Sequence, residues 1–370
     1  MIVFDKRGKA AIFLVFIFSK CYFLGKNKYG KKMRVLVTGG AGYIGSHTCV
    51  ELLEAGHEVF VIDNLSNGHE EAINRIRNIT NIELSFIKAD IRDSNALDKV
   101  FGTFKPDTVI HFAGLKAVGE SVERPLNYFD VNVGGSISLL AAMTRAKCNN
   151  IVFSSSATVY GIPQYLPYDE NHPTKPINPY GRSKLMVENI INDWVNVETN
   201  RKGTVLRYFN PVGAHESGHI GEDPIGTPNN LMPFIARVAL GHYECLNIYG
   251  NDYKTKDGTG ARDYIHVVDL AIAHVSSIEQ KKLNNYEIIN IGGGESNTVL
   301  ELLKKFQEIA GIKIEFKYLP RREGDHAASW ADTSKAVAKI NWQSERNIKK
   351  ICEDTWRWHK RNPNGYVSKT

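Results

Sequence analysis

The chain has 370 residues, 42% of them hydrophobic and 23% charged, and carries a formal net charge of +6. It is long enough for two domains, or for one large domain with a second lobe, and its composition is that of an ordinary soluble globular protein. The positive charge is concentrated in residues 1–32, which sum to +7 and leave −1 for the remainder, so the body of the protein is not expected to bind nucleic acid.

The five cysteines stand far apart in the sequence, at Cys21, Cys49, Cys148, Cys245 and Cys352. They show neither C-x-x-C nor histidine-rich spacing. This pattern argues against a zinc site and against a disulfide framework, and it favours a reducing compartment. We therefore expect a cytoplasmic protein that holds no metal.

Residues 1–32 are expected to form an extension outside the folded core. They contain a nine-residue apolar run, Ala10–Phe18, which follows three basic residues. The run is similar to the hydrophobic part of a signal peptide and is too short to span a bilayer as a helix. No small-x-small cleavage pattern follows it, and Met33 directly precedes the first strand-like run. We favour a non-structural extension, such as one read from an upstream start codon, over a targeting signal or a weak membrane-surface anchor, and expect no stable membrane insertion.

From Met33 onward, short β-branched runs alternate with helical patterns. We predict strands at Arg34–Thr38, Glu58–Asp63, Ile82–Lys88, Thr108–Phe112, Asn150–Ser155 and Thr204–Phe209, and helices at Tyr43–Ala55, at Glu70–Ile79 and from Tyr180 onward. Alternation at this spacing is typical of βαβ units. It predicts an α/β fold with a Rossmann-type, doubly wound parallel sheet.

A glycine-rich turn joins the first predicted strand to the first predicted helix. Gly39 permits the tight turn, Gly42 lets the backbone approach a pyrophosphate, and Gly45 packs the helix against the strand. The phosphates then lie at the helix N-terminus. Asp63 ends the next strand about twenty residues further on, where an acid binds the adenosine ribose 2′-OH and would repel a 2′-phosphate. The turn therefore predicts NAD rather than NADP as the cofactor.

Asp90 and Ile91 follow the third predicted strand and are expected beside the adenine of this cofactor. On structural grounds alone, Asp90 could equally be the N-cap of the helix that follows. The sequence leaves both interpretations open.

Tyr180 and Lys184 stand four positions apart in the stretch NPYGRSKL. On a helix they share one face, and Pro179 suits the helix start. A buried ammonium, together with the positive charge of oxidised nicotinamide, would lower the pKa of the Tyr180 phenol toward neutrality. The spacing alone also occurs in exposed Tyr/Lys pairs. The run FSSSATVY (Phe153–Tyr160), at the sheet edge where active sites lie, favours a reactive pair, with Ser156 bonding the substrate oxygen and relaying its proton.

Past Asn210 the sequence pattern changes. HESGHIGEDPIGTPNN (His215–Asn230) is rich in Gly, Pro and Asn and predicts a long loop, and loops of this length are usually functional. Shorter and less regular elements are expected after it, ending in a helix at Asn347–Lys360. We divide the chain into the extension 1–32, an NAD-binding domain at 33–210 and a smaller α/β substrate-binding lobe at 211–370, some segments of which return to the first domain.

The G-x-x-G-x-x-G spacing, together with Tyr180-x-x-x-Lys184, resembles the extended short-chain dehydrogenase/reductase family, from Met33 to about Tyr366. Six further stretches resemble the UDP-sugar 4-epimerases of that family: HFAGLKAVGES, YFNPVG, PNNLMP, GNDY, DGTGARDYIH and PRREGD. The nucleotide-sugar dehydratases of the family carry an acid pair where this chain has Ser156-Ala157-Thr158. The resemblance therefore implies oxidation without elimination of water.

The resemblance also implies two sets of ligand residues. The NAD-binding set is Gly39, Gly42, Tyr43, Ile44, Gly45, Asp63, Asn64, Asn67, Asp90, Ile91, Phe112, Ala113, Gly114, Lys116, Asn132, Ser154, Tyr180, Lys184 and Phe209. The set for the UDP-hexose substrate is Ser156, Asn210, Asn230, Leu231, Tyr249, Arg262, Arg322, Asp325 and Ser329. In this scheme Lys116 reaches the nicotinamide ribose and phosphate. Tyr249 packs on the uracil, Arg262 and Arg322 clamp the diphosphate bidentately, and Asp325 binds the uridine ribose.

The implied reaction interconverts UDP-glucose and UDP-galactose without net redox change, a step of galactose metabolism. Tyr180 as phenolate removes the proton of the sugar 4′-OH, and NAD⁺ takes the C4′ hydride. The resulting 4-keto sugar swings about its phosphate linkage, and the hydride returns to its other face. The substrate range is expected to depend on Ser329, where epimerases restricted to unmodified hexoses carry a bulky tyrosine. A small residue here predicts that the N-acetylated UDP-hexosamines are also accepted, unless another side chain such as Trp330 fills the space.

Two other functions stay open at this point. One is another nucleotide-sugar enzyme of the same family, such as a 4-epimerase of uronic acids or a decarboxylase. The other is a non-catalytic NAD-binding sensor, which would have no need of an intact Ser156, Tyr180 and Lys184. The resemblance further implies a homodimer, formed through the helices around Asn132–Lys147 and Tyr180–Glu198.

Overall fold

The computed structural model of the protein describes residues 3–4, 10–11, 31–228, 230–280, 283–322 and 324–367. The chain divides into two units, residues 1–31 and residues 32–370, and each is described by itself. In the first unit, β1 (Val3–Phe4) pairs antiparallel with β2 (Ala10–Ala11). The rest of the predicted apolar run, up to Phe18, lies outside the described residues, and so does Cys21. Within the described ranges, no helix is both long and apolar enough to cross a bilayer.

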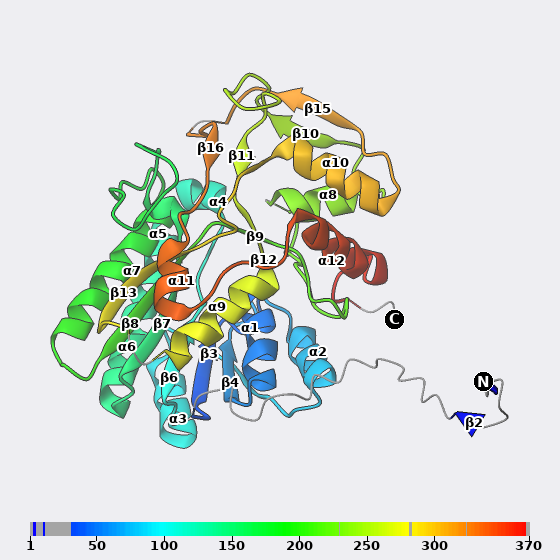
Figure 1. The fold of residues 1–370 in the computed structure, drawn as a ribbon. Coiled ribbons are helices and arrows are strands. Elements are labelled where there is room, and N and C mark those ends of the chain that lie inside the picture. The colour runs from blue at the N-terminus through cyan, green and yellow to red at the C-terminus, as the bar shows by residue number, and fades with distance from the viewer. Residues whose placement is uncertain are drawn as a thin grey trace. The chain divides into compact units, whose positions relative to one another are not determined.

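A seven-stranded parallel sheet forms the centre of the larger unit (Figure 1). In spatial order its strands are β13 (Tyr286–Ile291), β8 (Lys202–Tyr208), β7 (Asn150–Ser156), β6 (Thr108–His111), β3 (Arg34–Thr38), β4 (Glu58–Asp63) and β5 (Ser85–Lys88). The order reverses between β3 and β6, and doubly wound sheets bind ligands at the carboxyl edge of such a point. The predicted α/β fold with a doubly wound parallel sheet is confirmed.

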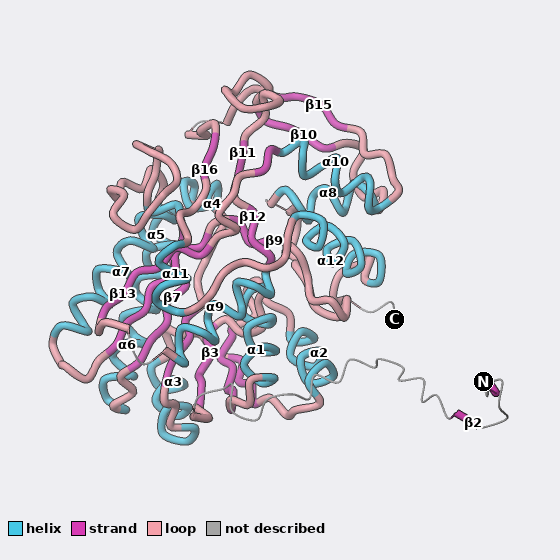
Figure 2. The backbone as a smooth tube through the Cα atoms, viewed as in Figure 1, coloured by secondary structure: helices cyan, strands magenta, loops and turns pink. Residues whose placement is uncertain are grey.

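Helices cover both faces of this sheet, as parallel strands require. One face packs against α1 (Tyr43–Glu54), α2 (Glu70–Thr80), α9 (Val267–Glu279) and α11 (Ser334–Ile340). The other face packs against α3 (Ser94–Phe104), α6 (Gly135–Ala146) and α7 (Pro179–Asn196). Because both faces are covered, the central strand residues Val35, Leu36 and Val37 are completely buried, which explains their continuous apolar run. Figure 2 shows the strands between the two helix layers.

Besides α9, α11 and β13, the second half of the larger unit contains small sheets and the helices that pack on them. Its sheets join β10 (Leu246–Tyr249) to β15 (Phe316–Leu319), β9 (Asn210–Val212) to β12 (Tyr264–His266), and β11 (Ala261–Arg262) to both β14 (Asn297–Thr298) and β16 (Ala328–Ser329). These helices are α8 (Leu231–Ala239), α10 (Val299–Ala310) and α12 (Ile348–Arg361). Their apolar sides enclose a separate core around Phe306, Leu302 and Leu303. Two short helices, α4 (Val118–Glu123) and α5 (Pro125–Tyr128), lead into a π-helical turn, Phe129–Gly134.

The expectation of shorter and less regular elements after the His215–Asn230 loop is wrong for two helices. α9 has 13 residues and α10 has 12, as many as α1 or more. The α9 sequence, VVDLAIAHVSSIE, is apolar around most of its circumference because the helix is buried between the sheet and its neighbours, so it lacks a clear helical period. α10 begins with a complete capping box, Thr298 and Glu301, a signal that the sequence does contain.

Candidate active site

Two glycines around the turn after β3 have no room for a side chain. A Cβ atom on Gly39, which has φ of +74°, would lie 2.7 Å from the backbone nitrogen of Ala113, and one on Gly45 would lie 2.2 Å from the carbonyl oxygen of Gly39. Gly42 is the N-cap of α1 and no side chain caps this helix. The first N–H groups of α1 can therefore bind an anion such as a pyrophosphate. Tyr43 and Ile44 form the first turn of the same helix.

Asp63, the last residue of β4, is fixed beside this turn. Its Oδ2 accepts a hydrogen bond of 3.0 Å from the backbone N–H of Ala41, and its Oδ1 one of 2.8 Å from that of Leu65. Burial raises the pKa of the Asp63 carboxyl, while the two backbone donors lower it. The carboxylate is thus held at the edge where the sequence places the adenosine ribose, with the exposed Asn67 in the turn that follows β4.

Asp90 belongs to the same edge. Its carboxylate accepts hydrogen bonds of 2.9 Å from Asn64 Nδ2 and from Arg92 Nε, and the bonds to Arg92 are the main reason that its pKa lies well below its usual range. The N-cap of α3 is Asp93, which accepts from the backbone N–H groups of Asn95 and Ala96. The alternative interpretation of Asp90 as that N-cap is therefore wrong.

Ile91 is 5% exposed and packs on the start of α6, where a Cβ atom on Gly135 would lie 2.5 Å from its Cδ1. Phe112, Ala113, Gly114 and Lys116 follow β6, the strand next to the glycine turn.

Asn132 is buried in the π-helical turn and ties the segment after β6 to α7. Its Oδ1 accepts from the backbone N–H of Leu115 at 2.7 Å, and its Nδ2 donates to the carbonyl of Leu115 at 3.1 Å and to Ser183 Oγ at 3.0 Å. Ser183 Oγ in turn donates to the carbonyl of Tyr180 at 2.8 Å. Both amide hydrogens of Asn132 are therefore used within the protein, and only its oxygen retains a lone pair for a cofactor.

The predicted reactive residues lie where the carboxyl end of β7 meets the first turns of α7. They are Tyr180, Lys184 and Ser156. Lys184 Nζ lies 5.9 Å from the centroid of the Tyr180 ring and donates a 2.7 Å hydrogen bond to the carbonyl of Ser154. Ser156, the last residue of β7, is close enough to the Tyr180 hydroxyl to lower the pKa of that phenol. The helix starts at Pro179 because Asn178 caps it, accepting a 2.8 Å hydrogen bond from the N–H of Gly181.

Burial is the largest influence on the pKa values of Lys184 and Tyr180. Burial lowers the pKa of Lys184 to about 8. Burial also raises the pKa of Tyr180, and this outweighs the effect of Ser156, which lowers it. In the chain by itself, the buried ammonium does not compensate for the desolvation of the phenolate. The lowering of the Tyr180 pKa, which was expected with oxidised nicotinamide bound, stays a prediction. The other contribution in that prediction, the nicotinamide charge, comes from outside the chain.

Two buried groups behind Lys184 were not predicted. Glu188, one turn further along α7, forms a 2.6 Å ion pair with Arg207 and accepts a 2.5 Å hydrogen bond from Ser155 Oγ. Its spacing of four residues from Lys184 was the only signal in the sequence. On the other side, Tyr208 is hydrogen-bonded to His274, and it is close enough to Ser154 for that side chain to lower the pKa of the Tyr208 phenol, which burial raises. Both groups hold the end of β7, to which Lys184 is bonded.

Five of the predicted substrate residues are placed by β11 and by its neighbours in the second half of the larger unit. Arg262 Nη2 forms a 3.1 Å ion pair with Asp325 Oδ1, and the guanidinium of Arg322 lies 3.8 Å from the ring centroid of Tyr249. Ser329, which is 8% exposed, stands opposite Arg262 in the pairing of β11 with β16. Arg262 is thus paired with Asp325, and Arg322 is stacked on Tyr249.

Asp263 organises this region, although the sequence did not single it out. Its carboxylate accepts hydrogen bonds from the backbone N–H groups of Gly293, Gly294 and Ala331, and burial raises its pKa to about 6. Its carbonyl accepts from Asn210 Nδ2 at 2.9 Å. Phe209 packs beside it against Tyr168. Asn230 is the N-cap of α8, which has no side-chain cap, and Leu231 is the first residue of that helix.

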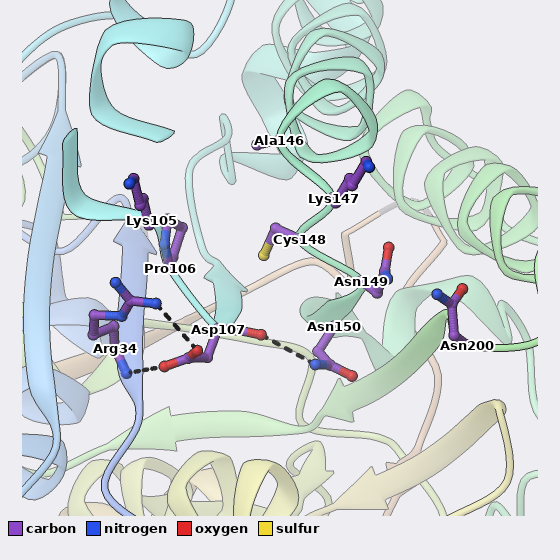
Figure 3. A pocket seen from close by; sticks show the side chains of 10 residues that line it. All are labelled: Arg34, Lys105, Pro106, Asp107, Ala146, Lys147, Cys148, Asn149, Asn150 and Asn200. Carbon is purple, nitrogen blue, oxygen red and sulfur yellow. Dashed lines mark hydrogen bonds and ion pairs between the residues drawn. The ribbon is translucent and has the colours of Figure 1, made fainter. Parts of the chain in front are cut away.

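A polar cavity of about 420 Å³ lies elsewhere, at the opposite end of the strands (Figure 3). Its lining includes Arg34 and Asn150, the first residues of β3 and β7, and Asp107, which pairs with Arg34. None of the predicted site residues lines it. The predicted site lies at the carboxyl ends of the strands, as expected for a doubly wound sheet.

Comparison with known proteins gives consistent results. The family model described as GDP-mannose 4,6 dehydratase matches residues 36–355. The UDP-glucose 4-epimerase of Bacillus subtilis (strain 168) is 52% identical over 338 residues, which is 91% of this chain and 99% of the relative.

Two crystal structures are also similar. That of UDP-glucose-4-epimerase from Stenotrophomonas maltophila, with bound NAD and formylated UDP-arabinopyranose, has a TM-score of 0.88 at 46% identity, covering 90% of this chain and 99% of that chain. That of UDP-glucose 4-epimerase from Bifidobacterium longum, in complex with NAD⁺ and UDP, has a TM-score of 0.87, with the same identity of 46% and coverage of 90% and 99%.

Proposed function

This chain belongs to the UDP-glucose 4-epimerase family of extended short-chain dehydrogenases/reductases, and from that premise we propose that it interconverts UDP-glucose and UDP-galactose with NAD as its cofactor. The observation that carries the proposal is the juxtaposition of Tyr180, Ser156 and Lys184. Tyr180 can exchange a proton with a sugar hydroxyl, and Ser156 can relay that proton. Lys184 places a positive charge beside the Tyr180 ring.

The residues around the glycine turn fit NAD. Gly39 and Gly45 have no space for a side chain, the N-terminus of α1 is uncapped, and the Asp63 carboxylate stands where a ribose diol would bind. NAD, when bound there, serves as acceptor and donor of the hydride at the sugar's C4′.

Tyr180 is proposed to take the proton of the 4′-OH, with Ser156 as the relay. At pH 7 a Lys184 pKa of about 8 leaves most of these side chains protonated, so that the ammonium stabilises the phenolate. The carbonyl of Ser154 holds this ammonium in place. When the hydride returns, the same tyrosine gives its proton back, so a single residue serves both directions of the reaction.

Arg262, Arg322, Tyr249 and Asp325 are proposed to hold the UDP moiety. Planar guanidinium groups match the oxygens of a diphosphate, and an aromatic ring beside an arginine suits the stacking of a uracil base. Asn210 and Asn230 add amide groups on the side of the sugar and diphosphate.

The test is to incubate the purified protein with UDP-galactose and measure UDP-glucose with a coupled assay. We expect conversion in both directions, with NAD present in the protein when it is examined by native mass spectrometry. Tyr180→Phe should lower turnover by at least about 10²-fold, since it removes the proton acceptor, while NAD stays bound. A protein that retains NAD but converts neither sugar would instead support the sensor or another UDP-sugar enzyme of the family.

We further propose that UDP-sugars with a 2-acetamido group are accepted. Ser329 lies opposite Arg262, in the region assigned to the substrate, and its side chain is much smaller than a tyrosine.

A homodimer is also proposed. Four apolar side chains on α4, α5, α6 and α7 are at least 43% exposed, namely Val122, Leu126, Ile137 and Met186. A patch of this kind marks an interaction surface, and it includes the two helix regions predicted to form the dimer. A reducing compartment such as the cytoplasm suits Cys49, Cys148, Cys245 and Cys352, which are unpaired thiols.

A further inference from the structure

Glu222 is a buried carboxylate in the loop between β9 and α8. Its side chain is 7% exposed, and its Oε1 accepts two hydrogen bonds. One comes from Lys116 Nζ at 3.0 Å and the other from Asn230 Nδ2 at 2.7 Å. A carboxylate oxygen has two lone pairs, so both acceptor positions of this atom are filled.

The two donors come from the two halves of the proposed site. Lys116 follows β6 beside the glycine turn and is assigned to the cofactor. Asn230 is the N-cap of α8 and is assigned to the substrate. They are 114 positions apart in the sequence, yet both lie within hydrogen-bonding distance of a single oxygen atom.

The backbone around Glu222 is held firmly by the C-terminal segment. Trp358 Nε1 in α12 donates to the carbonyl of Glu222 at 3.2 Å. On one side, Gly221 packs so closely on Trp358 that a Cβ atom would lie 2.4 Å from its ring. On the other side, Asp223 accepts a 2.8 Å hydrogen bond from the backbone N–H of Tyr366, and its carbonyl accepts one of 3.0 Å from His69. The carboxylate is therefore presented from a rigid support.

The charge of Glu222 acts on the side chain of Tyr43. Burial and then the charge of Glu222 raise the pKa of Tyr43, which stands in the first turn of α1. An unpaired carboxylate at this place would repel the phosphates of a bound dinucleotide. The ammonium of Lys116 compensates for it, so the pair presents no net charge to the cofactor.

We propose that Glu222 is a positioning residue that couples the cofactor half of the site to the substrate half, by holding Lys116 and Asn230 on one oxygen. The inference rests on the proposed function for the assignment of the two halves. Lys116 and Asn230 share Oε1, so a ligand that contacts one of them also alters the hydrogen bond of the other to Glu222. Such coupling between two ligands is reciprocal. A purely structural glutamate would stabilise the fold and leave the two ligands independent.

The first experiment compares Glu222→Gln with wild type and with Glu216→Gln, an exposed glutamate in the same loop. The readouts are the dissociation constant of UDP by calorimetry, the rate of NAD release after gel filtration, and the melting temperature. We expect Glu222→Gln to weaken UDP binding and to speed NAD release, each by about 10-fold, as loss of a charged hydrogen-bond acceptor implies. Glu216→Gln should match wild type. If Glu222→Gln behaves like Glu216→Gln in both ligand measurements, the proposal is wrong.

A second experiment does not depend on how well Glu222→Gln folds. Lys116→Met, Asn230→Ala and the double variant form a double-mutant cycle on side chains that are not fully buried. We expect Lys116→Met to weaken UDP binding and Asn230→Ala to speed NAD release. For each ligand, the effect of the double variant should be smaller than the product of the two single-variant effects. If the double variant instead shows the full product of the two single-variant effects, Lys116 and Asn230 act independently and the proposed coupling is wrong. Absence of turnover in wild type would reject the proposed function, whereas the UDP and NAD measurements would still test Glu222.

Discussion

At the scale of single residues, Lys184 combines burial with a charge that the proposed chemistry requires. It is 5% exposed, and its pKa of about 8 is lower than the value near 10.5 of a solvated lysine. Burial favours the neutral amine, while Glu188 one turn away favours the ammonium. The side chain is therefore held at a cost in folding free energy, as is common for groups that serve a reaction.

Lys184→Met should lower kcat by at least about 10²-fold, because the phenolate of Tyr180 loses its countercharge. It should also change the pH dependence of stability. Between pH 8 and 10.5 the unfolded wild type binds more protons than the folded one, so wild-type stability gains from this group as the pH rises through that window. From pH 7 to pH 9.5 we expect the free energy of unfolding of wild type, relative to the variant, to increase by about 2 kcal/mol in urea titrations. A difference that does not change with pH would show that the folded Lys184 titrates normally.

Ser329→Tyr should narrow the substrate range. A tyrosine in β16 would occupy the space next to Arg262, so we expect the kcat/KM ratio of UDP-N-acetylglucosamine to UDP-glucose to fall by at least about 10-fold, since steric exclusion of a substituent costs more than 1.4 kcal/mol. Ser329→Ala is the matched control and should keep the wild-type ratio. Equal selectivity in all three proteins would contradict the proposal.

The residues that could be predicted from the sequence are those whose chemical type and local spacing are diagnostic. Gly39, Gly45, Tyr180 and Lys184 belong to this class, since a turn or a helix fixes their geometry over a few positions. Glu222 could not be found in this way. Its partner Lys116 lies 106 positions earlier, and it stands in a Gly- and Pro-rich loop without periodicity.

At the scale of elements, the site depends on where α7 begins. Asn178 caps the helix by accepting from the N–H of Gly181, and Tyr180 is the second helical residue. Any fraying of the first turn therefore moves the reactive hydroxyl. α12 offers a matched comparison because Asn347 caps it in the same manner, accepting from the N–H of Lys350.

Asn178→Ala and Asn347→Ala should each lower the free energy of unfolding by about 1 kcal/mol, the usual loss for an N-cap. Only Asn178→Ala should reduce kcat, because only that helix carries Tyr180. Urea titrations and steady-state assays of the two variants check both parts. Equal kcat values in the two variants would show that the position of Tyr180 does not depend on the cap.

The elements of the first half were predictable because short apolar, β-branched runs alternate there with helical patterns. β3 and β4 have the predicted bounds, and the third strand only begins later than expected, at Ser85. β13, with the sequence YEIINI, was missed because the second half lacks the strand and helix alternation that guided the first half. Its pairing with β8 is set by tertiary contacts, which a local pattern does not contain.

At the scale of the whole molecule, the exposed apolar patch on α4, α5, α6 and α7 predicts self-association. Leu126, at 80% exposure, is its most exposed member. Leu126→Glu should place a charge in the proposed interface and weaken the dimer by at least about 30-fold, as expected for a central contact worth 2 kcal/mol. Ile82→Glu changes an exposed apolar residue outside the patch and should have no effect. Sedimentation velocity over a range of concentrations measures both, and a monomeric wild type would contradict the prediction.

The pairing of β13 with β8 has a consequence for how the protein is made. During synthesis on a ribosome, β8 emerges early, while its neighbour β13 follows only after β9, α8, β10 and α9. Until then β8 is an unprotected edge with the buried residues Val205 and Leu206, which can pair with other chains. A fragment that ends before Tyr286 should therefore aggregate rather than form a free-standing nucleotide-binding module, and light scattering of the purified fragment measures this.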